Sequence, residues 1–163
     1  MCEWLADYNV GWVEDFIHPE RFDEYADIRA GSPVPIAAGE QLATIWDFGR
    51  FIAEGCCDVI QPDLSRCGGL SVAAKLVGLA EDSGIDLVPH SWLTHLLTGF
   101  SLQLIATLPR ARFVEFNVSQ SALTRGITRT GLALAVDGTV AIPDTPGIGV
   151  EVDGKFVKAH RVN

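Results

Sequence analysis

The sequence predicts an α/β protein built on a parallel sheet. Short apolar runs typical of buried strands alternate with longer segments whose apolar residues recur at helical spacing. Each of five successive apolar runs leads into an ionisable residue, and the steps between these residues are 26, 23, 27 and 25: Glu14, Glu40, Asp63, His90 and Glu115. Each step is about the length of one strand and one helix, so helices are expected to connect parallel strands.

The individual elements follow from the same pattern. Strands are expected at residues 10–14, 36–40, 58–61, 85–88 and 112–115, and helices at residues 21–30, 44–54, 69–83 and 93–108. Gly55, Gly84 and Pro109 are typical residues for ending the last three of these helices. In the helix of residues 44–54, helical spacing predicts that Ile45, Phe48 and Ile52 face the core. Near the C-terminus, residues 132–136 and 139–142 flank Asp-Gly, a strong β-hairpin signal.

Composition limits the class of protein. The chain has 163 residues, 48% of them hydrophobic and 20% charged, which is typical of one globular domain. Its net charge of −9 argues against a nucleic-acid partner. No apolar run approaches the roughly 20 residues that span a bilayer, and the first residues do not resemble a secretory signal. The four cysteines form no CxxC pair, which favours a reducing cytoplasm.

The ionisable residues after the strands are the candidate functional residues. One acid after a strand is more often a helix cap or turn residue. Five in phase favour a shared site, because carboxyl ends of parallel strands meet at one edge, where both (β/α)8 barrels and open α/β sheets hold active sites. Glu14 and Glu40 offer the oxygen ligands that Mg²⁺ prefers. Asp63 with His90 suits proton transfer, because a carboxylate orients an imidazole and raises its basicity.

Less functional interpretations stay open for several of these residues. His90 could simply lie near a helix N-terminus without any chemistry. His95 is expected to pack or to lie at the edge of the site rather than to share a metal. Arg66 could steer an anion near the site or form a surface ion pair.

Four motifs carry a resemblance to a known family: WVEDF, PIAAGEQ, DVIQPDLSRCGG and LVPHSW. In this order and spacing they resemble the barrel domain of the enolase superfamily, in its mandelate racemase branch, over residues 12–152. The resemblance implies one Mg²⁺, with Glu14 and Glu40 as two of its three acidic ligands. It also implies an acid–base dyad of Asp63 and His90, and a hydrogen bond from Glu115 to the substrate carboxylate or the developing enolate.

The same resemblance implies the fold and the domain organisation. Residues 1–130 are expected to form the C-terminal portion of a TIM-type barrel, with about five parallel βα units. Residues 131–163 are expected to form a hairpin and a tail that return towards a capping domain. The capping domain, the early strands, a lysine base and the first metal ligand are expected to lie outside this sequence. One local difference is Asp15-Phe16, where the family usually has Glu-Pro.

The function implied is a Mg²⁺-dependent enzyme that removes a proton α to a carboxylate, with an acid-sugar dehydratase favoured. The alternatives are a racemase or epimerase of a 2-hydroxy acid, and a non-catalytic truncated remnant. The expected partner is a small-molecule carboxylate, the longer parent is expected to be a homo-oligomer, and neither nucleic acid nor membrane is expected to bind. This chain alone is expected to show no turnover.

Overall fold

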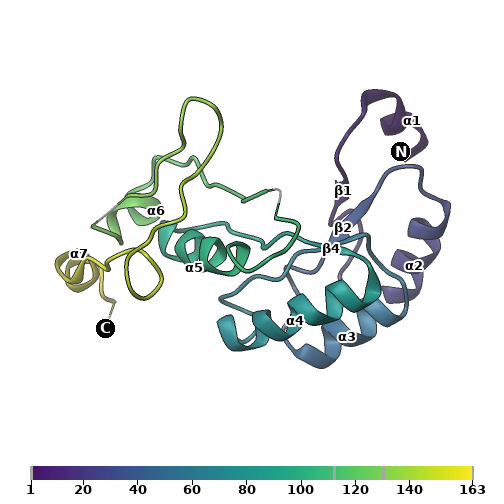
Figure 1. The fold of residues 1–163 in the computed structure, drawn as a ribbon, viewed down its shortest axis with the longest axis horizontal. Helices are drawn as coiled ribbons and strands as arrows, with labels where there is room; N and C mark the ends of the chain where they lie inside the picture. The colour runs from purple at the N-terminus through teal and green to yellow at the C-terminus, as the bar shows by residue number, and fades with distance from the viewer. Residues whose placement is uncertain (1, 112, 130, 163) are drawn as a thin grey trace. The chain divides into compact units, whose positions relative to one another are not determined.

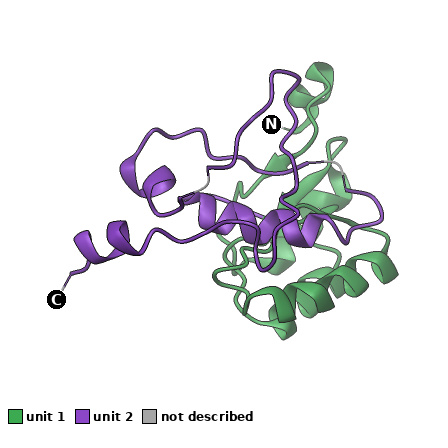
Figure 2. Cartoon of the chain, turned by 60° about the vertical axis from the view of Figure 1, so that its left-hand side comes forward, with its two compact units in different colours: residues 1–89 green, residues 90–163 purple. Residues whose placement is uncertain are grey.

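The computed structural model describes residues 2–111, 113–129 and 131–162 (Figure 1). The chain divides into two compact units, residues 1–89 and residues 90–163 (Figure 2). The sequence predicts a different division, between a barrel portion of residues 1–130 and a tail of residues 131–163. That division stays a prediction.

The first unit contains a four-stranded parallel sheet in the order β1-β2-β3-β4. Its strands are β1 (Val13–Glu14), β2 (Ile36–Ala38), β3 (Val59–Ile60) and β4 (Asp86–Leu87). In register, Ala38 is opposite Ile60, which is opposite Leu87. The parallel sheet confirms the predicted fold class, although each strand is shorter than its apolar run.

Three helices connect these strands: α2 (Phe22–Gly31), α3 (Ile45–Ala53) and α4 (Leu70–Ser83). Strand order follows chain order, so crossovers of one hand bring all three helices to the same side of the sheet (Figure 1). Thr44 and Asp47 form a reciprocal capping box at the start of α3, and Gly84 ends α4 with a left-handed φ of 70°. Ahead of β1, the chain forms α1 (Cys2–Leu5) and a short 3-10 helix, η1 (Ala6–Tyr8).

Aromatic side chains fill the core between α2 and α3. The ring of Phe51 lies 4.9 Å from that of Phe22 and 5.2 Å from that of Tyr25, both in edge-on arrangements. Phe48 is also fully buried, as the sequence predicts. The prediction for Ile45 and Ile52 is wrong, because both are only partly buried and Phe51 takes the core position.

The second unit contains α5 (His95–Ile105), α6 (Ala122–Gly126) and α7 (Gly154–Ala159). The predicted hairpin turn is confirmed: Leu134 bridges Val140 in antiparallel fashion, and Ala135 N donates to Thr139 O at 2.8 Å. The predicted strand at 112–115 is wrong for the part that the structure describes. Residues 113–115 belong to no strand, and residue 112 lies outside the described residues.

None of the helices in the described parts of the chain is long and apolar enough to span a membrane. All four cysteines are free thiols, and the cytoplasmic location inferred from them stays a prediction.

Candidate active site

The sheet brings three of the predicted acids to one edge of the first unit. Glu14 is the last residue of β1, Glu40 comes two residues after β2, and Asp63 comes three residues after β3. Because the strands are parallel, these are all carboxyl ends and lie at the same edge. His90 comes three residues after β4 and begins the second unit.

Glu14 is exposed, and one of its oxygens is held by two neutral donors. Its Oε2 accepts a hydrogen bond from the indole Nε1 of Trp12 at 2.9 Å and another from Nε2 of Gln61, also at 2.9 Å. Gln61 is only 4% exposed, so its side-chain amide is buried. Sequence reasoning missed Gln61, although a polar residue two positions after a buried strand residue was a usable signal.

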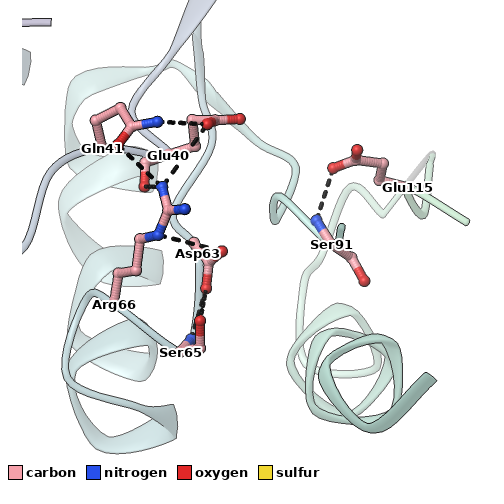
Figure 3. A network of polar contacts seen from close by, with 7 residues as sticks. All are labelled: Glu40, Gln41, Asp63, Ser65, Arg66, Ser91 and Glu115. Carbon is pink, nitrogen blue, oxygen red and sulfur yellow. Dashed lines mark hydrogen bonds and ion pairs between the residues drawn. The ribbon is translucent and has the colours of Figure 1, made fainter. Parts of the chain in front are cut away.

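Glu40 lies within a small polar network around the guanidinium of Arg66 (Figure 3). Nη1 of Arg66 is 3.8 Å from Glu40 Oε1 and donates to Gln41 Oε1 at 3.0 Å. Nε of Arg66 is 4.0 Å from Asp63 Oδ2. Gln41 in turn donates to Glu40 Oε1 at 2.7 Å. Arg66 therefore contacts acids at the ends of two neighbouring strands, in addition to any role in steering an anion.

Gly39, just before Glu40, has a backbone that an L side chain rarely adopts, with φ of 130°. A Cβ there would lie 2.9 Å from Ile60 Cδ1 and 3.2 Å from Gln61 N. We expect Gly39→Ala to lower the free energy of unfolding by about 1–3 kcal/mol, because it adds strain and overpacks the sheet. Urea unfolding would measure this.

The matched control is Gly49→Ala in α3. Nothing lies within 4 Å of a Cβ at Gly49, so alanine should stabilise the helix by about 0.5–1 kcal/mol. Equal effects of the two substitutions would show that Gly39 is not required for the close approach of β2 and β3.

Asp63 has a buried side chain with one oxygen fixed by the following turn. Its side chain is 2% exposed, and Oδ1 accepts hydrogen bonds from Ser65 N at 2.7 Å and Ser65 Oγ at 2.6 Å (Figure 3). The Asp63 carbonyl accepts from Cys67 N at 2.8 Å. Asp63 thus forms the turn before α4, and these donors fix the orientation of its carboxylate. Ser65 was not identified from the sequence.

In the second unit, Glu115 contacts the residue that follows His90. Ser91 N donates to Glu115 Oε2 at 2.6 Å (Figure 3). His90 itself is 8% exposed. Ser91 Oγ and Thr98 Oγ1 share a hydrogen bond of 2.9 Å, which ties the segment to α5. Glu115 therefore lies beside the segment that carries His90 although residues 113–115 form no strand. Sequence reasoning did not find Ser91, because its donor is a backbone amide.

His95 packs in the core of the second unit, one of the two placements expected for it. It is fully buried at the start of α5, and its ring centroid lies 5.2 Å from that of Phe116. Burial lowers the pKa of His95, so the ring stays neutral at pH 7. Among the described residues, two buried side-chain atoms have no hydrogen-bond partner, namely Nδ1 of His95 and Oγ of Ser101.

The buried thiols are not candidate nucleophiles. Burial raises the pKa of Cys56 to about 11 and the pKa of Cys57 to about 12, so both stay protonated at neutral pH. Within the described residues, no group of three or more His, Cys, Asp or Glu side chains could hold a metal ion.

Comparison with known proteins gives a family and several relatives. Residues 1–156 match the family described as enolase C-terminal domain-like. The chain is 35% identical over 165 residues to a D-galactarolactone cycloisomerase of Agrobacterium fabrum, covering 96% of this chain and 43% of that protein.

Two solved structures are also similar. One is the 3,6-anhydro-D-galactonate cycloisomerase of Zobellia galactanivorans, with TM-score 0.89 and 30% identity, covering 98% of this chain and 45% of that one. The other is the L-talarate dehydratase of a Polaromonas species, complexed with Mg and L-glucarate. It has TM-score 0.84 and 26% identity, covering 97% of this chain and 41% of that one. The chain thus spans less than half the length of each of these relatives.

Proposed function

The chain belongs to the enolase C-terminal domain-like family, and from that premise we propose that it forms part of the active site of an acid-sugar dehydratase. The observation that carries this proposal is the set of three carboxylates, Glu14, Glu40 and Asp63, at the carboxyl ends of three consecutive parallel strands. His90 follows the fourth strand. Such a set suits removal of a proton next to a carboxylate, where negative charge must be stabilised and a proton must move.

Glu14 and Glu40 would hold the Mg²⁺ ion. Their chemistry fits, because Mg²⁺ prefers carboxylate oxygens and retains several waters, which requires solvent access. Glu14 is exposed and the side chain of Glu40 is 21% exposed. Oε1 of Glu14 accepts no hydrogen bond from the described residues. When bound, the ion supplies positive charge that stabilises the substrate carboxylate as its α-carbon loses a proton.

The proton steps are assigned to Asp63, His90 and Glu115. The α C–H bond breaks, its proton passes to the lysine base that the family resemblance implies, and its electron pair forms a double bond between the α- and β-carbons as the β C–O bond breaks. Protonated His90 gives a proton to the departing hydroxyl, which leaves as water, and the enol product tautomerises to a 2-keto-3-deoxy acid. Asp63 orients His90 and stabilises its charged form, and Glu115 hydrogen-bonds to the substrate.

A cycloisomerase is the second candidate, favoured by the names of two of the relatives. D-Galactarolactone cycloisomerase is the 35%-identical protein, and 3,6-anhydro-D-galactonate cycloisomerase is the structure at 30% identity. In that reaction class a ring opens or closes within one molecule, so the departing oxygen stays attached and no water is released. A racemase or epimerase would return a proton to the same carbon. A non-catalytic remnant would catalyse none of these reactions.

Mg²⁺ affinity tests the metal assignment. We expect calorimetric titration to show weak binding by this chain, because two carboxylates leave most of the octahedral shell to water. Glu40→Gln and Glu14→Gln should each weaken Mg²⁺ binding by about tenfold or more. Tenfold is the minimum expected, because removing a residue that only supports a metal ligand already costs about that much. Glu54→Gln is the matched control, since Glu54 pairs with Arg50 at the end of α3. Unchanged affinity in Glu40→Gln would remove Glu40 from the site.

A further inference from the structure

We propose that Trp12 and Gln61 are positioning residues that hold one oxygen of Glu14 and thereby present its other oxygen to the metal. The inference rests on the proposed function, in which Glu14 is a Mg²⁺ ligand. It gives two uncharged side chains, which take no part in proton transfer, the role of orienting a metal ligand.

The strand register explains why both donors can reach Glu14. Glu14 is opposite Ala37, and Ala37 is opposite Val59, so these three side chains lie on one face of the sheet. Trp12 is two residues before Glu14 and Gln61 is two residues after Val59, which keeps both on that face. One donor, Trp12, directly precedes β1, and the other, Gln61, directly follows β3, which is two strands away from β1 in the sheet.

Both donors are held in place by packing. Trp12 packs against the buried cluster of Ala37, Val59 and Val88, and Gln61 is 4% exposed. Each donates to the same atom, Glu14 Oε2, over 2.9 Å. With Oε2 fixed from two directions, the carboxylate cannot rotate freely, and Oε1 is the oxygen that accepts no hydrogen bond from the described residues.

The charge of the donors distinguishes Glu14 from Glu40. The indole and the amide are neutral, so they bring no positive charge to Glu14 that would compete with a cation. Glu40, in contrast, has the guanidinium of Arg66 3.8 Å from its Oε1, so a positive charge already lies beside it. Glu14 is therefore the ligand that is oriented in advance without being neutralised. Supporting hydrogen bonds of this kind typically contribute 10- to 100-fold to metal affinity.

A simpler explanation is that the buried amide of Gln61 only needs an acceptor. In that case its removal would change stability and leave metal affinity unchanged. The two explanations therefore differ in a measurable way.

The test uses Mn²⁺ as a paramagnetic probe, since it shares the oxygen ligands of Mg²⁺. In ¹⁵N NMR of the protein, we expect Mn²⁺ to broaden the indole N–H signal of Trp12 at lower concentration than that of Trp46. Trp46 is the control because it is 80% exposed on α3 and contacts no candidate ligand in the described structure. Excess Mg²⁺ should reverse the broadening.

Affinity is then measured from the free Mn²⁺ signal in electron paramagnetic resonance. Gln61→Met and Trp12→Phe should each weaken Mn²⁺ binding by about tenfold. The control is Gln103→Met, which removes an amide donor to Pro143 O in the second unit and touches no carboxylate. Trp12→Phe keeps an aromatic ring against the buried cluster, so it tests the donor even where Gln61→Met fails to fold.

The outcomes separate the inference from the proposed function. Tenfold losses in both variants, with Gln103→Met unchanged, support the positioning role. If the wild type binds Mn²⁺ and Trp12→Phe binds it with the same affinity, the positioning role is overturned and the proposed metal site is not. Absence of Mn²⁺ binding at Trp12 in the wild type overturns Glu14 as a ligand, and with it the proposed metal site.

Discussion

Asp63→Asn is expected to lower turnover nearly as much as His90→Asn, by about 10²–10⁴-fold. The protein tested is a full-length one that contains this chain and is as long as its relatives. Ser65 fixes Oδ1 of Asp63 through two hydrogen bonds, so an amide at this position would sit in the same turn without the charge. In the proposed dyad the charge of Asp63 selects the tautomer of the His90 imidazole and stabilises its protonated form, so the proposal requires that charge for turnover. The double variant should cost little more than either single one, since the two residues act as a unit.

Steady-state kinetics at saturating Mg²⁺ measure this effect. Mg²⁺ affinity should be nearly unchanged, because neither Asp63 nor His90 is assigned as a ligand. Asp82→Asn, an exposed acid in α4, is the matched control and should keep normal turnover. Near-normal turnover in Asp63→Asn would contradict the dyad, whatever the result for His90.

Phe51→Ala is expected to produce the largest loss of stability, about 4 kcal/mol in the free energy of unfolding. Phe51 is 1% exposed, and its ring contacts those of Phe22 and Tyr25. Removing it leaves a cavity between α2 and α3, which the surrounding rings cannot fill without leaving their own positions.

The neighbouring residue provides the control for this substitution. Ile52 is only partly buried, so Ile52→Ala should cost clearly less than Phe51→Ala in urea unfolding. Equal losses at the two positions would mean that the aromatic cluster does not form the core of the first unit.

The sheet could be predicted from the sequence because its signals are local. Each strand of the first unit lies in a largely apolar stretch of the sequence. Two of the helices also have recognisable capping residues, Thr44 at the start of α3 and Gly84 at the end of α4. The face of α3 was harder to predict. Helical spacing allows two different buried faces for α3. One contains positions 48 and 51, and the other contains positions 45, 48 and 52. Only packing against α2 decides which face is buried.

The prediction of a strand at residues 112–115 is wrong for a different reason. An apolar pair before an acid resembles the other strand ends, but a strand needs a neighbour to accept its hydrogen bonds. Residues 113–115 have no such partner strand in the described structure, and the contact that Glu115 makes is through its side chain, whose Oε2 accepts a hydrogen bond from Ser91 N. Pairing of this kind depends on residues far away in the sequence, which a local pattern cannot reveal.

The acids of the candidate site were predictable, whereas their hydrogen-bonding partners were not. Glu14 and Asp63 stand out because an ionisable residue follows an apolar run. Trp12, Gln61 and Ser65 become partners only through strand register and turn geometry. Gln61 lies two residues after Val59 in the sequence, but this spacing does not indicate that its amide contacts Glu14.

Product formation from acid sugars in D₂O tests the central proposal most directly. The full-length protein is incubated with Mg²⁺ and a panel of acid sugars in D₂O and followed by ¹H NMR. The proposal predicts that at least one acid sugar forms a 2-keto-3-deoxy product carrying solvent deuterium, and that His90→Asn abolishes this product. A ring-opened or ring-closed isomer without loss of water would instead identify the cycloisomerase. The absence of both α-proton exchange and product with every acid sugar would contradict the proposed function.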